Sequence, residues 1–149
     1  MSLTRLVYFS RSRIDKDTAG TRREVANILA KANQKNSACG LSGALILHDD
    51  YFAQVLEGDR RFVNETFQRT CRDDRHDGID IVEISTVAER LFPQWSMALG
   101  RKLDPAVAMR FGIGARFDPS SMTAEGMIRM LTEVIREEAP LRVYQAQSA

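Results

Sequence analysis

The spacing of hydrophobic residues changes from that of a strand to that of a helix within the first third of the chain. Residues 3–10 form an apolar run of strand length, and the polar residues 11–20 that follow predict a loop. A helix is expected next, from a capping residue at Thr21 to about Asn36, because apolar residues recur there every three or four positions. These apolar residues are Val25, Ile28, Leu29 and Ala32.

The same reading continues with a β-hairpin, a second helix and two more strands. Apolar runs over 41–47 and 51–57 are separated by three polar residues, which is the pattern of a hairpin. A helix begins near Gly58, and strands are expected over 79–86 and 95–101. The order β-α-β-β-α-β-β predicts an α+β fold of the ferredoxin-like type, a mostly antiparallel sheet with two helices on one face.

The last third of the chain predicts helices. We expect a short helix from Pro105 and a longer one that is capped by Ser120 or Ser121 and ends at Pro140. The longer helix carries an apolar stripe: Met127, Met130, Leu131, Val134 and Ile135. Because the first two strands are apolar on both faces, this stripe is expected to cover the sheet face that the other helices leave open. Residues 1–104 would form the core, and 105–149 a helical extension of the same domain.

Composition narrows the range of partners. The 149 residues include 21 Lys and Arg against 20 Asp and Glu, a net charge of +1, so binding to nucleic acid or to an anionic membrane through bulk charge is not expected. The two cysteines, Cys39 and Cys71, exclude a disulfide framework or a zinc ribbon. No apolar run approaches the roughly 18 residues of a membrane span, so we expect a soluble, cytoplasmic protein, and we predict no metal site.

Two polar side chains occupy positions where a core is expected. The strand period places Gln54 between Phe52 and Leu56 on one face, and Tyr8 on the corresponding face of the first strand. A buried amide and a buried phenol each need hydrogen-bond partners. From the residues alone, two interpretations stay open: ordinary core residues bonded to backbone, or a polar pair beside a groove between the two helices.

Several blocks of the sequence, taken in order, resemble the BLUF family, the blue-light sensors that use flavin. The resemblance covers about residues 3–100, and the short length with a helical tail resembles the stand-alone members, which lack a fused output domain. The two most specific blocks are Phe52–Gly58 and Arg90–Met97. The blocks read Leu-Val-Tyr-Phe-Ser, Leu-Ser-Gly, Phe-Ala-Gln-Val-Leu-Glu-Gly, Arg-Asp-Asp-Arg-His and Glu-Arg-Leu-Phe-Pro-Gln-Trp-Ser-Met.

The resemblance implies that FAD, with FMN as the alternative, binds non-covalently between the first two helices. It assigns the photochemical relay to Tyr8 and Gln54, and signal output to Trp95 and Met97. The implied cofactor-binding residues are Ile28, Lys35, Asn36, Phe52, Arg75 and His76. Lys35 departs from members that carry a second Asn before Asn36, and Ser42 stands where Thr is commoner.

In that family, light drives an electron and a proton from the tyrosine toward the flavin, and the glutamine then rearranges its hydrogen bonds. The protein would therefore be a photosensor with no catalytic turnover, acting through a downstream regulatory protein. Self-association into a dimer or a larger ring is also expected.

Two other functions fit a small ferredoxin-like domain. A phosphatase acting on acyl phosphates would need an arginine in a phosphate loop, for which Arg11-Ser12-Arg13 is the candidate. An RNA binder would need aromatic side chains on an open sheet face.

Overall fold

The computed structural model describes residues 3–14, 18–48, 50–93, 95–100 and 118–145. The strands are β1 (Leu3–Ser12), β2 (Ser42–His48), β3 (Tyr51–Asp59), β4 (His76–Thr86), β5 (Trp95–Gly100) and β6 (Val143–Gln145). The helices are α1 (Thr18–Cys39), α2 (Arg60–Cys71), the 3-10 turn η1 (Pro119–Ser121) and α4 (Ala124–Arg142).

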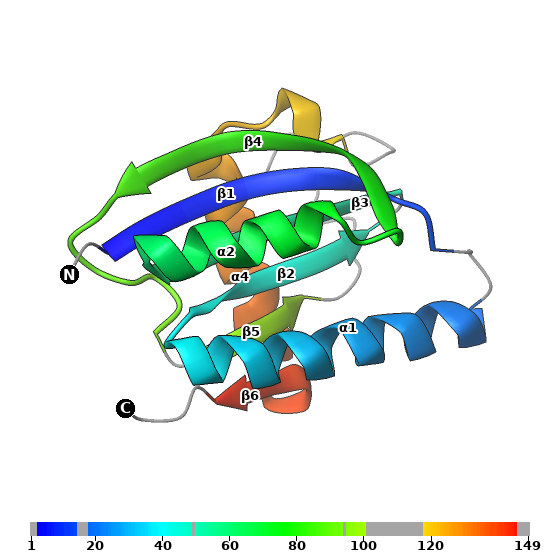
Figure 1. Cartoon of the computed structure of the whole chain (residues 1–149). Coiled ribbons are helices and arrows are strands. Elements are labelled where there is room, and N and C mark those ends of the chain that lie inside the picture. The colour runs from blue at the N-terminus through cyan, green and yellow to red at the C-terminus, as the bar shows by residue number, and fades with distance from the viewer. Residues whose placement is uncertain (1–2, 15–17, 49, 94, 101–117, 146–149) are drawn as a thin grey trace.

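In this part of the chain the strands form one sheet in the order β4-β1-β3-β2-β5-β6. β1 pairs with β3 and β4, and β2 pairs with β3, all antiparallel, whereas β5 runs parallel to β2. α1 and α2 lie on one face of the sheet and α4 crosses the other (Figure 1). The expected ferredoxin-like α+β fold is confirmed, and so is the packing of the C-terminal helix on the second face.

The alternation of side chains along the strands produces two cores. On the α1–α2 face, Leu6 and Tyr8 of β1 pack with Phe52 and Leu56 of β3 and with Val63 of α2. The opposite face packs under α4. Its buried residues are Val7, Phe9, Ala44, Ile46, Ala53, Val55, Phe92, Met127, Met130, Leu131, Val134 and Ile135. Both faces of the central strands are therefore apolar because both are covered.

Several boundaries differ from the expected ones. α1 begins at Thr18, so Thr21 lies in its first turn. α4 begins at Ala124, because the Thr123 hydroxyl caps it by accepting from the Gly126 N–H at 3.0 Å. Pro140 does not end α4, which continues to Arg142; the fixed φ of a proline is itself a helical value. The boundary at 104/105 and the helix from Pro105 lie outside the described residues.

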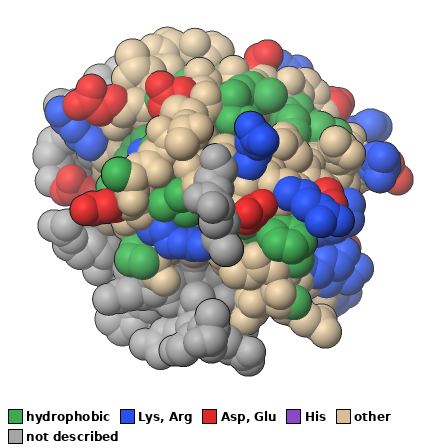
Figure 2. Space-filling view, turned by 60° about the vertical axis from the view of Figure 1, so that its left-hand side comes forward, with side chains coloured by type: hydrophobic (Ala, Val, Ile, Leu, Met, Phe, Trp, Pro, Cys, Tyr) green, Lys and Arg blue, Asp and Glu red, His purple; other side chains and the backbone are tan. Residues whose placement is uncertain are grey.

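Two features of the structure concern nucleic-acid and membrane binding: the charges on its surface and the apolar length of its helices. Figure 2 shows basic and acidic side chains interspersed on one face, consistent with the net charge of +1. Within the residues described, no helix has both the length and the apolar character that crossing a bilayer requires.

Candidate functional site

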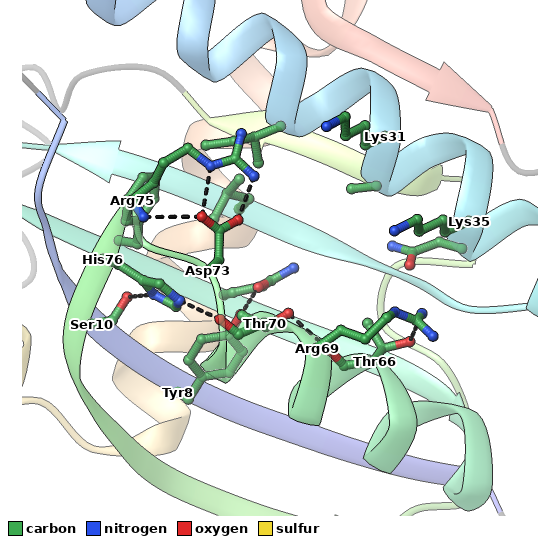
Figure 3. Close-up of a pocket in the computed structure, with 16 residues that line it drawn as sticks. Tyr8, Ser10, Lys31, Lys35, Thr66, Arg69, Thr70, Asp73, Arg75 and His76 are labelled. Atoms are coloured by element: carbon green, nitrogen blue, oxygen red, sulfur yellow. Dashed lines mark hydrogen bonds and ion pairs between the residues drawn. The ribbon is translucent and has the colours of Figure 1, made fainter.

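A cavity of about 180 Å³ lies between α1 and α2, above the strands (Figure 3). Its apolar lining comes from Ile28 and Ala32 on α1, Leu45 on β2 and Phe52 on β3. The polar lining comes from both helices, the sheet and the turn before β4. These residues are Tyr8, Ser10, Lys31, Lys35, Asn36, Gln54, Thr66, Arg69, Thr70, Asp73, Arg75 and His76. The cavity thus has an apolar part and a polar part, and four of the polar residues are Lys or Arg.

Tyr8 and Gln54 form a hydrogen-bonded pair on the sheet side of this cavity. The register of β1 and β3 places the two residues directly opposite each other. The Tyr8 hydroxyl donates to Gln54 Oε1. Tyr8 is buried, with the Phe67 ring of α2 edge-on at 5.2 Å between centroids. The antiparallel pairing therefore brings together two polar side chains 46 residues apart in sequence.

Burial also controls the ionisation of this phenol. It raises the pKa of Tyr8 well above the ordinary value of 10.0, and a hydrogen bond with the Thr70 side chain opposes the rise only in part. Tyr8 is consequently a neutral phenol at physiological pH, with its proton directed at the Gln54 carbonyl oxygen.

His76 holds one end of the cavity together. Its Nδ1 lies 2.7 Å from Ser10 Oγ and its Nε2 lies 2.6 Å from the Thr70 carbonyl oxygen. A carbonyl oxygen can only accept, so Nε2 carries the proton. Nδ1 shares a second hydrogen bond with the Ser10 hydroxyl, which can either donate or accept. His76 thus connects β1 to the last turn of α2, and its ring stands edge-on to Phe52 at 6.2 Å.

Arg75 is bound by two carboxylates beside the cavity. Its Nε donates to Asp73 Oδ1 at 2.8 Å, a second guanidinium nitrogen meets Asp73 Oδ2, and Nη1 lies 3.7 Å from Glu24 Oε2 on α1. The hydrogen bond from Arg75 lowers the pKa of Asp73, so that carboxylate stays ionised. Arg75 therefore bridges the turn before β4 to α1, and its charge is already balanced.

Three further cations line the cavity. Lys31 and Lys35 stand one turn apart on α1, and Arg69 faces them from α2 (Figure 3). Arg69 donates to Thr66 Oγ1 at 3.1 Å, which leaves most of its guanidinium donors directed elsewhere. These exposed cations give the site its capacity for a phosphate-bearing ligand.

The structure brings every residue expected at a cofactor to this cavity. Tyr8 and Gln54 lie on its floor, and the lining includes the six residues Ile28, Lys35, Asn36, Phe52, Arg75 and His76. Their individual roles stay predictions. Trp95 and Met97 begin β5, but their side chains are outside the described part of the structure.

Sequence reasoning missed Lys31, Arg69, Thr70 and Asp73, which also line the cavity. Helical spacing could have found Lys31, which lies four residues before Lys35 on the same side of α1. Asp73 carried no such signal, because only the folded turn brings it against Arg75.

The geometry does not support the two alternative functions. Arg11 and Ser12 continue strand β1, and the Ser12 and Arg13 N–H groups already donate to the carbonyls of Asp50 and Arg75, at 2.7 and 2.8 Å. A phosphate loop needs such N–H groups directed at the anion. The RNA-binding reading fails because α4 covers the second sheet face.

Comparison with known proteins gives the chain its family. The family model "BLUF: Sensors of blue-light using FAD" matches residues 3–98. The chain is 30% identical over 82 residues to the blue light- and temperature-regulated antirepressor BluF of Escherichia coli strain K12, covering 55% of this chain and 19% of that protein. It is 27% identical over 97 residues to the photoactivated adenylate cyclase subunit beta of Euglena gracilis, covering 64% of this chain and 11% of that subunit. The chain thus matches less than a fifth of the length of either relative.

Solved structures share the fold. The photo-activated state of BlsA superposes with a TM-score of 0.78 at 24% identity, covering 98% of this chain and 99% of that one. The dark-state structure of the BLUF protein BlrB gives 0.68 at 23% identity, covering 92% and 97%. Family model, fold and cavity agree: the chain belongs to the BLUF family, the sensors of blue light that use FAD.

Proposed function

We propose that this blue-light sensor registers a photon by rearranging the hydrogen bond between Tyr8 and Gln54, and that it signals the change to a partner protein. The observation that carries the proposal is that hydrogen bond itself, formed on the floor of a cavity between α1 and α2. A hydrogen-bonded phenol and amide can exchange a proton without leaving a lasting buried charge.

The residues of the cavity fit FAD. Ile28, Leu45 and Phe52 offer apolar surface for a flat aromatic ring. The buried Asn36 carries both donors and an acceptor, which suits a ring edge that presents an N–H beside carbonyl oxygens. Lys31, Lys35 and Arg69 would hold the phosphates, and Arg75 would do so only in competition with Asp73. When bound, FAD supplies the absorption of blue light and the acceptor for an electron.

Tyr8 and Gln54 would act as one unit. Tyr8 gives up an electron and passes its phenolic proton to Gln54 Oε1, the atom that already accepts its hydrogen bond. Rotation or tautomerisation of the amide would then change which of its ends donates. The electron and proton would return to Tyr8 at once, so that only the changed hydrogen bonds persist until the amide relaxes in the dark. Glu at position 54 would introduce a buried charge, and Leu could neither donate nor accept.

Output would pass through β5, which carries Trp95 and Met97. β5 pairs with β2, whose Leu45 lines the cavity, and α4 packs against β5. A change in one hydrogen bond biases such an equilibrium by about 1 kcal/mol, so the output should be graded and depend on the partner. Self-association into a dimer or ring is part of this proposal.

The relay is tested by removing one polar group at a time. Tyr8→Phe and Gln54→Leu are expected to retain bound FAD and to abolish the reversible red shift of its absorption under blue light. Tyr51→Phe is the matched control, because that ring packs edge-on to Phe9 on the opposite sheet face. A normal shift in either relay variant, measured by difference absorption spectroscopy, contradicts the proposal.

The partner is tested separately. Affinity capture in light and darkness should recover a protein whose binding differs between the two states with wild type and not with Tyr8→Phe. Light scattering after size exclusion gives the oligomeric state. Equal capture in light and darkness removes the output step while leaving the photochemistry intact.

A further inference from the structure

A completely buried carboxylate, Glu57, lies outside the cavity and takes no part in the relay. It is on β3, three residues after Gln54, and has 0% relative exposure. A buried carboxylate is costly unless it is paired and hydrogen-bonded. The partners of Glu57 therefore indicate what its burial achieves.

Those partners tie β3 to the segment that leads into β5. Glu57 Oε2 accepts from Arg5 Nε on β1 at 2.9 Å. The Leu91 N–H donates to both carboxylate oxygens, at 3.0 and 2.9 Å, and the Phe92 N–H donates to Oε1 at 2.8 Å. Residues 89–92 belong to no helix or strand, so these hydrogen bonds hold their backbone in place.

Two arginines extend this arrangement to four elements. Arg90 donates to the Glu57 carbonyl at 3.1 Å, to Ser42 Oγ on β2 at 2.8 Å and to the Gly40 carbonyl after α1 at 2.8 Å. Arg5 also donates to the Glu89 carbonyl at 3.0 Å. We call Arg5, Glu57 and Arg90 the clasp. It joins β1, β3 and the α1–β2 turn to the same four-residue segment.

The clasp also positions the core beneath α4. Phe92, held through its N–H, is 1% exposed and packs in the cluster that contains Met127, Met130 and Leu131. Three residues further on, β5 begins at Trp95. A single carboxylate therefore fixes the end of β3 relative to the start of β5 and to the core under α4.

We propose that Glu57 is the positioning residue that couples the relay strand to the output strand. When the hydrogen bonds of Gln54 change, Glu57 would transmit the resulting movement of β3 to residues 89–92. This role rests on the proposed output route through β5. A rigid link of charged hydrogen bonds passes on a displacement of β3, whereas a loose link absorbs it. The FAD cavity does not include Glu57, so loosening the clasp should separate sensing from output.

The test uses the full chain with FAD bound and compares Glu57→Gln with wild type. An amide in place of the carboxylate turns one acceptor into a donor that faces Arg5 or the Leu91 and Phe92 N–H groups. In Glu57→Gln we expect a normal red shift and roughly tenfold faster hydrogen exchange at the Leu91 and Phe92 amides. We also expect the β5 amides to lose most of the difference between their exchange rates in light and in darkness. A role in stability alone would change exchange equally in both states.

Two further variants keep the test decisive. Arg90→Lys preserves the charge but replaces the planar guanidinium, which serves its three acceptors from two nitrogens, by one ammonium nitrogen. This variant decides the matter if Glu57→Gln does not fold. Glu65→Gln is the matched control, since Glu65 forms an exposed ion pair with Arg61 at 3.2 Å. The inference is overturned if the β5 amides of Glu57→Gln or Arg90→Lys keep the full light–dark difference in hydrogen exchange while Leu91 and Phe92 exchange faster. No light-dependent difference on β5 in wild type would instead overturn the output route itself.

Discussion

The phenol of Tyr8 shows how burial prepares a residue for its role. Phe67, the sheet and the last turn of α2 remove water from it, and its proton finds an acceptor in Gln54. The strand period alone placed Tyr8 and Gln54 on corresponding faces, but it could not show that they meet. That contact depends on the register of β1 with β3, which is set by the whole hairpin and its neighbours.

The raised pKa of Tyr8 predicts a dependence of stability on alkaline pH. Above about pH 10 the unfolded chain loses the phenolic proton while the folded protein keeps it, so stability falls as pH rises. Well below pH 10 both states are protonated and this contribution is constant. Between about pH 9 and pH 11, wild type should lose about 1.4 kcal/mol more than Tyr8→Phe. Urea unfolding of both proteins at pH 9 and pH 11 measures this difference, and parallel losses contradict it.

At the scale of elements, the predictions succeeded where a pattern is local and failed where contacts between elements decide. The order of strands and helices through β5 follows from hydrophobic spacing. The three residues of β6 are too few to show a strand pattern, and they form a strand by pairing with β5. The start of α4 depends on the Thr123 cap, which competed with two plausible serines just before it.

Gly43 fixes how closely β2 and β3 approach. A Cβ at this position would overlap the carbonyl oxygen of Val55 on β3, and backbone cannot move aside as a side chain can. Gly43→Ala should therefore lower the free energy of unfolding by about 1–3 kcal/mol, measured by urea denaturation. Gly126→Ala in α4 is the control. Its Cβ would meet Thr123 Oγ1 at 3.3 Å, and alanine favours the helix, so no comparable loss is expected.

The whole molecule is a sheet shared by two cores, with the cavity on one side and α4 on the other. Val7 and Tyr8 are neighbours in β1 that serve opposite cores, and Val55 stands in the same relation to Gln54 in β3. The apolar character of both strand faces predicted this three-layer arrangement. The cavity could not be predicted from such a pattern, because its lining residues come from both helices, four strands and the turn before β4.

Because the two cores share the central strands, a destabilising substitution under α4 should also weaken the binding of FAD in the cavity. Leu131 is fully buried, so Leu131→Ala should cost about 2–5 kcal/mol. Because the two cores share the strands, loss of helical circular dichroism and release of FAD should occur at the same urea concentration. Ile84→Ala, at a site 49% exposed, is the control and should change little. Release of FAD well before the loss of helix would show that the two faces unfold independently.

The position of β5 inside the sheet limits how an output strand can move. β5 is paired on both sides, parallel to β2 and antiparallel to β6. Sliding by one residue would turn every side chain to the opposite face, and sliding by two, about 6.6 Å, would break and remake both ladders. A small signal is therefore carried by a tilt or a change of twist in β5. Any larger step would also have to break the pairing of β5 with β6, a strand of three residues at the edge of the sheet.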